Sequence, residues 1–457
     1  MSKVFFLTGG HMLMDNIKWA AIMEVRYRYL PPDPLITENW KEVWLKRLEN
    51  LQPALYNWLL HPLRDEHFKQ GSICEDMQRI KTPAFIIAGM ADTYSNNIEK
   101  TLQGLSCPKR ALIGPWVALY PNQAVPGPRW DFCAQAIKWW DRWLKGKEPS
   151  KEEPEFLHYL QNRDPANPRA EHVDGQWICD PKTEPKIYHL GEGRLGDYNG
   201  DEKVSFCTKE TVGFCSGGTT LPTKLADLPG EQSADDMESC YFETEPFSED
   251  TSFCGNPVVH VSIASDKTVA SVFVRLCKVN KAGESLLLSY TAWNLTHDAS
   301  HETVTPLLPG DFKEVEIKLE ILSEIIKKGS RLRLCFTTAL FPLFVPNPEH
   351  TTLTLDLSKC SLKMPLLTNY TAYNQPMIEP NNPEPGLTTL LSKPYDERSV
   401  IEDCNTGRKT LLHRQSTGQR RIDSHGLVTE LRSDTKESLV PDDPTSLHVQ
   451  LNHQAVW

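Results

Sequence analysis

The stretch from Ala84 to Tyr94 reads Ala-Phe-Ile-Ile-Ala-Gly-Met-Ala-Asp-Thr-Tyr, and it decides how the N-terminal part of the chain folds. Its first five residues are apolar and follow Thr82-Pro83, which is typical of a strand buried on both faces of a parallel sheet. A second such run, Arg110–Ile113, ends at Gly114-Pro115, and residues 97–105 between the two have helical composition. This order predicts two parallel strands joined by a crossover helix.

Amphipathic helices are expected on either side of this unit. After Thr37, a predicted N-cap, one helix face carries Trp40, Val43, Trp44, Leu48 and Leu51. Pro53 is expected to open a second helix, because its missing N–H costs nothing at that position. A third helix, ending at Gly146, is expected to bury Phe132, Ala136, Trp140, Trp143 and Leu144.

Beyond about residue 151 the apolar residues recur with a period of two. Five segments alternate in this way, around Val259–Ile263, Val272–Leu276, Val315–Leu319, Leu332–Phe336 and Leu353–Leu357. Many short strands separated by Gly, Pro and Asn turns predict a β-sandwich of the jelly-roll type. From about residue 369 the chain becomes rich in Pro and Asn and then polar, which predicts a β-rich or partly disordered extension.

Several segments resemble those of the CocE/NonD serine hydrolases, which include cocaine esterase, α-amino-acid ester hydrolases and X-Pro dipeptidyl peptidases. Gly89–Tyr94 is similar to their G-G-W-x-D-x-Y segment, and Gly114–Pro121 is similar to their G-P-W-x-H-x-Y-P segment. Trp139–Gly146 resembles the helix that leads out of their catalytic domain. Arg331–Leu334, before Phe341-Pro342, resembles the G-x-R-L-R-L strand of their C-terminal domain.

The resemblance implies an α/β plus all-β fold, in which an incomplete α/β-hydrolase domain with a helical cap precedes a galactose-binding-like jelly roll. The boundaries expected are a cap remnant at 1–82, the end of the hydrolase domain at 83–150, the jelly roll at 151–368 and the extension at 369–457. The chain is thus identified as an N-terminally truncated member, whose nucleophile would lie upstream of Thr8-Gly9-Gly10.

Such enzymes act through a serine nucleophile, a histidine base and an orienting carboxylate. Asp92 occupies the acid position of the motif, although an Asp there could equally begin a turn or cap a helix. Ala118 stands where the histidine belongs, and a methyl group cannot accept a proton. The nucleophilic serine is missing, because no G-x-S-x-G segment is present.

Substitutes for the two missing residues are poor. His11, His61 and His67 all precede Asp92 and are interpreted as surface or packing residues. Ser106, in Gly104-Leu105-Ser106-Cys107-Pro108, precedes a strand instead of joining a strand to a helix, so it is interpreted as a loop serine. The chain alone is therefore predicted to be inactive.

The bulk composition excludes other classes. With 60 acidic and 49 basic residues the net charge is −11, so neither a nucleic acid nor a phosphate-rich surface is an expected partner. No apolar stretch approaches the length of a membrane span. The twelve cysteines are scattered, without a C-x-x-C pair, which indicates reduced thiols in the cytosol and neither a metal nor a cofactor.

Three hypotheses of function follow. The chain is half of a split acyl or peptide hydrolase that docks onto a separate N-terminal hydrolase segment, or a remnant whose coding sequence lost its 5′ part. Alternatively it is a non-catalytic binding protein built on the jelly roll. The choice between ester and peptide substrates stays open, and so does self-association into a homo-oligomer.

Overall fold

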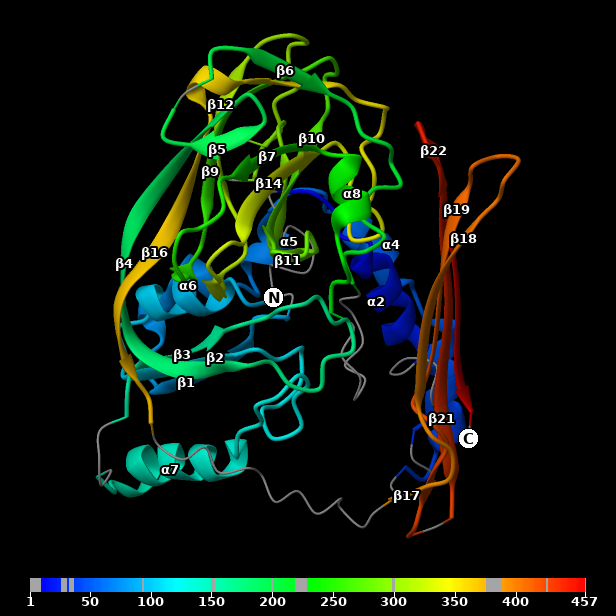
Figure 1. The fold of residues 1–457 in the computed structure, drawn as a ribbon. Coiled ribbons are helices and arrows are strands. Elements are labelled where there is room, and N and C mark those ends of the chain that lie inside the picture. The colour runs from blue at the N-terminus through cyan, green and yellow to red at the C-terminus, as the bar shows by residue number, and fades with distance from the viewer. Residues whose placement is uncertain are drawn as a thin grey trace.

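The computed structural model describes residues 10–25, 31–32, 37–92, 94–148, 153–198, 200–217, 228–297, 301–374, 388–424 and 426–456. They form a mixed α/β structure with a large C-terminal region rich in β-sheet (Figure 1). The α-helices within these ranges are α2 (Asp15–Met23), α3 (Trp40–Glu49), α4 (Ala54–Leu59), α5 (Glu66–Lys69), α6 (Asn97–Gly104), α7 (Phe132–Lys145) and α8 (Ser233–Met237). None of the helices in these ranges is long and apolar enough to cross a membrane.

Within the described residues, sixteen strands join into one large sheet and six later strands form a second sheet. The large sheet contains β1 (Ala84–Gly89), β2 (Lys109–Gly114), β3 (Phe156–Gln161), β4 (Gly175–Gly191), β5 (Arg194–Gly196), β6 (Lys203–Phe206), β7 (Cys240–Thr244), β8 (Thr251–Gly255), β9 (Val258–Ser265), β10 (Ser271–Val279), β11 (Ser285–Asn294), β12 (Lys313–Lys318), β13 (Leu322–Ile326), β14 (Arg331–Thr337), β15 (Leu353–Asp356) and β16 (Ser361–Ala372). The second sheet contains β17 (Thr388–Leu390), β18 (Tyr395–Glu402), β19 (Lys409–Ser416), β20 (Arg420–Ile422), β21 (Val428–Val440) and β22 (Asp443–Val456).

The predicted strand, helix and strand unit is confirmed. β1 and β2 are parallel and pair from Ala84 with Lys109 to Gly89 with Gly114. The crossover is α6, which buries Ile98 and Leu102 against the sheet. β2 also pairs in parallel with β3, and β3 pairs antiparallel with β4. Strand β3 therefore joins the parallel unit to the antiparallel remainder of the large sheet.

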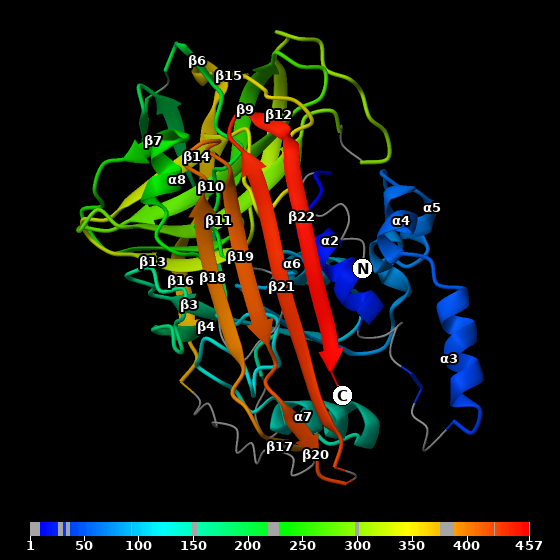
Figure 2. The same cartoon turned by 90° about the vertical axis from the view of Figure 1, so that its right-hand side faces the viewer.

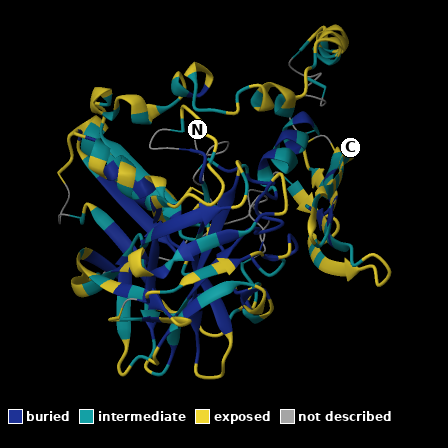
Figure 3. Ribbon diagram, turned by 90° about the horizontal axis from the view of Figure 1, so that it is seen from above, coloured by how far each residue is buried: buried dark blue, intermediate teal, exposed yellow. Residues whose placement is uncertain are grey.

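The alternating segments beyond residue 151 form the predicted strands. They supply the apolar residues of β9, β10, β12, β14 and β15, whose side chains meet in one core. Val261, Val274 and Leu334 are each 2% exposed or less. Seen from above, the buried residues of these strands fill the middle of the molecule, and the helices around them are largely exposed (Figure 3). Local alternation was thus sufficient to predict which side chains face this core.

The second sheet stands as a layer beside the large sheet, with α2 lying next to it (Figures 1 and 2). Met14, Phe341 and Leu439 form a small buried cluster between the N-terminal segment, the large sheet and β21. The Lys18 ammonium on α2 lies 3.2 Å from the Glu437 carboxylate on β21. The N-terminal segment therefore links the two sheets.

Two helices differ from expectation in burial. The predicted helix around Trp44 forms, but it begins after Asn39 and buries none of its residues. The helix α7 ends at Gly146 as predicted, but its Trp140 and Leu144 side chains are 56% and 79% exposed, so their predicted burial is wrong. The reason is that α7 faces the sheet through Trp139, whose ring lies 5.6 Å from that of Phe85 on β1.

Candidate active site

Two loops lie side by side where β1 and β2 end. The backbone N–H of Met90 donates to the Gly114 carbonyl at 2.8 Å, and that of Ala91 donates to the Trp116 carbonyl at 3.0 Å. A Cβ atom on Gly89 would lie 2.0 Å from the Trp116 oxygen, so only glycine permits this approach. The carboxyl ends of parallel strands are where open α/β sheets place their ligands. The loops that carry Asp92 and Ala118 therefore share one edge.

Asp92 is partly buried and sits in a tight turn before α6. Its Oδ1 accepts a hydrogen bond from the Tyr94 N–H at 3.0 Å, and its carbonyl accepts one from the Ser95 N–H at 3.1 Å. Both contacts belong to the turn that the sequence also allowed. Neither contact involves a catalytic partner, so the role of Asp92 as the acid stays a prediction.

A cavity of about 90 Å³ opens beside Asp92, between this loop and β11. Its polar lining includes Asp92, Ser95, Gln161, Arg163, Ser289 and Glu320. The two serines already donate to residue 320, Ser95 to a carboxylate oxygen at 3.1 Å and Ser289 to the backbone carbonyl at 2.6 Å. None of the described residues around this cavity is a histidine. Among the described residues the cavity thus offers two carboxylates and hydroxyl groups, but no imidazole to take a proton.

Ala118 lies on the loop after β2, and its side chain is exposed. The loop is held by neighbouring residues: the Val117 N–H donates to the Val125 carbonyl at 2.9 Å, and the Trp116 indole donates to the Pro128 carbonyl at 2.8 Å. These contacts hold the backbone next to position 118, where the side chain is a methyl group.

Sequence comparisons agree with this arrangement. Residues 1–120 match the X-Pro dipeptidyl-peptidase family S15. Residues 180–423, more than half of the chain, match the X-Pro dipeptidyl-peptidase C-terminal non-catalytic domain. The chain belongs to the X-Pro dipeptidyl-peptidase family. No curated protein matches the sequence.

Solved structures of similar fold include hydrolases and a peptidase. A CocE/NonD family hydrolase from Staphylococcus aureus is 14% identical, with a TM-score of 0.56 over 80% of this chain and 65% of its own. An aminopeptidase from a marine sediment Thaumarchaeota archaeon is 15% identical, with a TM-score of 0.60 over 79% of this chain and 70% of its own. An α-amino acid ester hydrolase is 16% identical, with a TM-score of 0.52 over 80% and 68%. The chain thus spans about two thirds of the length of the solved structures that it resembles.

One serine and histidine couple does occur in this X-Pro dipeptidyl-peptidase relative, but far from the two loops. His11 Nδ1 lies 2.6 Å from the Ser271 Oγ, and His11 Nε2 donates to the Val345 carbonyl at 2.5 Å. Burial lowers the pKa of His11 to about 4, so the ring is neutral. In a catalytic triad the second ring nitrogen bonds a carboxylate, whereas in His11 it bonds a backbone carbonyl. The Ser271 side chain is also buried, at 2% exposed. This pair anchors the N-terminal segment to β10.

The other substitutes considered from the sequence also lie elsewhere. The rings of His61 and His67 stack with 4.2 Å between centroids, and His61 Nδ1 lies 2.5 Å from the Asp65 carboxylate. Ser106 is exposed and lies in the connection between α6 and β2, as its neighbours in the sequence predicted. The structure therefore does not bring any of them to Asp92.

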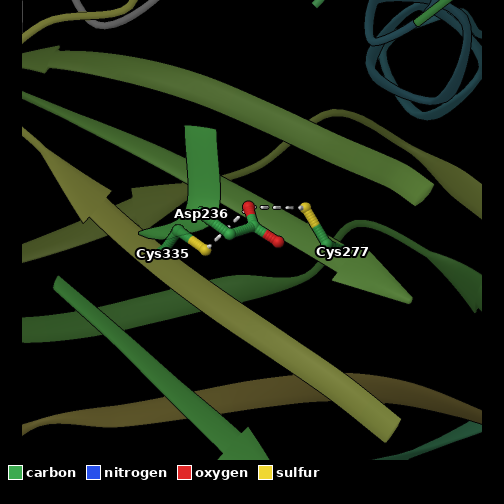
Figure 4. Close-up of side chains that lie close together, drawn as sticks. All are labelled: Asp236, Cys277 and Cys335. Atoms are coloured by element: carbon green, nitrogen blue, oxygen red, sulfur yellow. Dashed lines mark hydrogen bonds between the residues drawn. The ribbon is translucent and has the colours of Figure 1, made fainter. Parts of the chain in front are cut away.

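A buried polar centre inside the β-rich region was missed by sequence reasoning. The Asp236 carboxylate accepts hydrogen bonds from Arg275 and Arg333, each at 2.9 Å, and from the Ser285 hydroxyl at 2.6 Å. Figure 4 shows the thiols of Cys277 and Cys335 beside the same carboxylate. Because two guanidinium groups already neutralise Asp236, this centre is structural. The sequence held one signal of this centre, the Arg-Leu-Arg-Leu alternation of β14, which places Arg333 on the face opposite the apolar side chains.

Proposed function

We propose that this chain is the C-terminal portion of an acyl or peptide hydrolase of the X-Pro dipeptidyl-peptidase type, and that it does not hydrolyse its substrate alone. The observation that carries the proposal is Ala118, an exposed methyl group on the loop that borders the Asp92 loop. A serine nucleophile needs a base to hold its proton, and loss of any triad member lowers the rate by several orders of magnitude.

The β-rich region has the features of a jelly roll of the galactose-binding type. Its strands pair almost entirely antiparallel, as β10 does with both β11 and β14 and β9 does with β12. Their inner faces meet in one apolar core. These features support the finer fold assignment, in which two layers enclose a single core.

The cytosol is the compartment that we propose for the protein. All twelve cysteines are free thiols, and Cys277 and Cys335 remain unpaired although both contact Asp236. Disulfides form readily in secreted proteins and are rare where glutathione keeps thiols reduced.

A separate hydrolase segment is the partner that we propose, and the open side of β1 is its docking site. Among the described strands β1 pairs only with β2, so its second edge offers unpaired N–H and carbonyl groups. Beside it α7 exposes Ile137, Trp140 and Leu144, at 56%, 56% and 79%. An additional parallel strand and its helix would satisfy this edge and cover these side chains.

A fluorophosphonate probe tests the absence of activity, because it reacts covalently only with an activated serine. The purified chain should remain unlabelled at concentrations that label an intact serine hydrolase completely. Labelling of any serine that disappears in Asp92→Ala would contradict the proposal. The control is Asp65→Ala, which removes a carboxylate remote from the cavity. If this variant is labelled like the unaltered chain, the loss in Asp92→Ala is specific to Asp92.

Restoring the missing groups tests the assignment of Asp92 and Ala118. DNA upstream of the chain, in frame or in a neighbouring gene, should encode a G-x-S-x-G segment. Co-expression of that segment with Ala118→His should yield ester or peptide hydrolysis, and adding Asp92→Asn should abolish it. Equal turnover with Ala118→Gln, which supplies no base, would show that position 118 does not hold the histidine.

A further inference from the structure

A cluster of acidic and imidazole side chains lies between loops of the large sheet and a turn of the second sheet. Glu210 follows β6, His350 precedes β15, and Asp442 occupies the turn between β21 and β22. One ligand atom from each of the three lies within 4.8 Å of the others. The residues are remote in sequence, so only the fold brings them together.

The histidine is held on both of its nitrogens. Its Nδ1 lies 2.7 Å from Glu210 Oε1, and its Nε2 lies 2.9 Å from the Cys207 thiol. The other oxygen of Glu210 accepts a hydrogen bond from the Asp442 N–H at 2.6 Å. The His350 side chain is 40% exposed, which leaves the cluster open to solutes.

Among the described residues the two carboxylates of the cluster have no lysine or arginine partner, and the base that contacts Glu210 is the His350 imidazole. Glu210 is only 4% exposed. A buried carboxylate is normally paired with a cation or coordinates a metal ion.

The Asp236 centre shows what a paired carboxylate looks like in the same protein. There Arg275 and Arg333 occupy the space in which a cation could bind. Beside Glu210 the corresponding space is bordered by the His350 imidazole and the Asp442 carboxylate, and both are groups that can ligate a metal ion. The two centres are therefore chemically different, although both combine acids with cysteine.

We propose that Glu210, His350 and Asp442 bind a divalent transition-metal ion of the zinc class. One imidazole nitrogen and two carboxylate oxygens form a ligand set that suits Zn²⁺ or Co²⁺, with water completing the coordination. Binding through Nδ1 leaves the Nε2–H to donate to Cys207, a partner of the kind that fixes the tautomer of a metal-ligating histidine. The proposal does not depend on the hydrolase assignment.

The ion has a structural consequence. Asp442 lies in the turn between β21 and β22 of the second sheet, whereas Glu210 and His350 flank β6 and β15 of the large sheet. Figure 2 shows the strands β21 and β22 that this turn joins. A shared ion ties this turn to the large sheet. Metal binding therefore makes opening of the second sheet less favourable, because a ligand that binds only the closed form stabilises that form.

Titration with Co²⁺ and Zn²⁺ tests the site, with calorimetry for stoichiometry and visible absorption of Co²⁺ for its ligands. Because Cys133 and Cys404 are exposed thiols that could bind metal adventitiously, the titration uses a Cys133→Ser, Cys404→Ser background. We expect one ion per chain and no thiolate charge-transfer band. Hydrogen exchange in β21 and β22 should slow when the ion is added.

Two variants and one control decide the outcome. His350→Ala and Asp442→Asn should each weaken binding by at least ~10-fold, since each removes a ligand or its charge. Asp442 has a φ of 62°, a conformation that asparagine tolerates, so this variant keeps the turn even if His350→Ala fails to fold. His260→Ala, at an exposed histidine that pairs with Glu316, should leave binding unchanged. Absence of a stoichiometric ion, or unaltered binding in Asp442→Asn, would overturn the proposal.

Discussion

Strands β1 and β10 are both apolar, yet the structure buries them to different degrees. All nine residues of β10 are buried, including Arg275 and Lys278, which are charged. In β1, five of six residues are only partly buried, although every one of them is apolar. The difference lies in their neighbours: β10 has β11 on one edge and β14 on the other, whereas β1 pairs with β2 alone in the described chain. Position in the sheet, more than composition, thus decides burial.

Removing the carboxylate at the centre of the β-rich region should have the largest effect. We expect Asp236→Ala to lower the free energy of unfolding by about 3–5 kcal/mol, because it leaves the buried guanidinium groups of Arg275 and Arg333 without their shared partner. Urea denaturation measures the change. Glu314→Ala, in the exposed pair with Lys359, is the control and should leave the midpoint unchanged. Equal urea midpoints for the two variants would show that the buried carboxylate stabilises the fold no more than the exposed one does.

Truncating one leucine in each region compares their packing directly. Leu334→Ala in β14, where the side chain is fully buried, should cost about 2–5 kcal/mol by leaving a cavity. Leu144→Ala on α7, where the side chain is 79% exposed, should change stability by less than ~0.5 kcal/mol. Denaturant unfolding of both variants at the same protein concentration is the measurement. A large loss for Leu144→Ala would mean that another surface covers α7.

Adding a methyl group tests how rigid the parallel unit is. Gly89→Ala should destabilise the protein by roughly 1–3 kcal/mol, because the new Cβ meets the Trp116 backbone carbonyl. Gly71→Ala is the matched control, since nothing lies within 4 Å of a Cβ there. Thermal unfolding of the two variants is compared with that of the unaltered chain. Tolerance of Gly89→Ala would indicate that the loops after β1 and β2 separate easily.

The free energy of unfolding should depend on pH through His158 on β3, the strand that joins the parallel unit to the rest of the large sheet. Burial lowers the pKa of His158 from 6.5 to about 3, so the unfolded chain takes up this proton first as the pH falls. Stability from this group is complete above pH 6.5 and is lost towards pH 3, by at most about 1.4 kcal/mol per pH unit.

Replacing this histidine isolates its share of the pH dependence. His158→Phe should flatten the fall in urea midpoint between pH 6.5 and pH 4, relative to the unaltered chain. His11 contributes in the same direction, because its pKa is also lowered, so only the difference between the two proteins is interpreted. Parallel pH profiles for the variant and the unaltered chain would show that His158 remains neutral in the unfolded state or protonates freely in the folded one.

The sequence by itself determined the local elements and the order of the candidate site. The apolar runs at Ala84 and Arg110 predicted parallel strands, and the period of two predicted the strands of the β-rich region. Both signals are local, because strand and helix periodicity is written within ten or so residues. The motif spacing likewise placed Asp92 and Ala118 after two adjacent strands, while their catalytic assignment stays a prediction.

Only the tertiary structure decided which distant groups meet and which apolar faces are covered. Asp236 meets Arg333 across 97 residues, and Glu210 meets His350 across 140 and Asp442 across 232. No periodicity encodes such pairs, since they depend on how the whole sheet is ordered. The exposure of Leu144 has the same origin: an amphipathic helix specifies an apolar face, but the arrangement of the sheet determines whether anything packs against it.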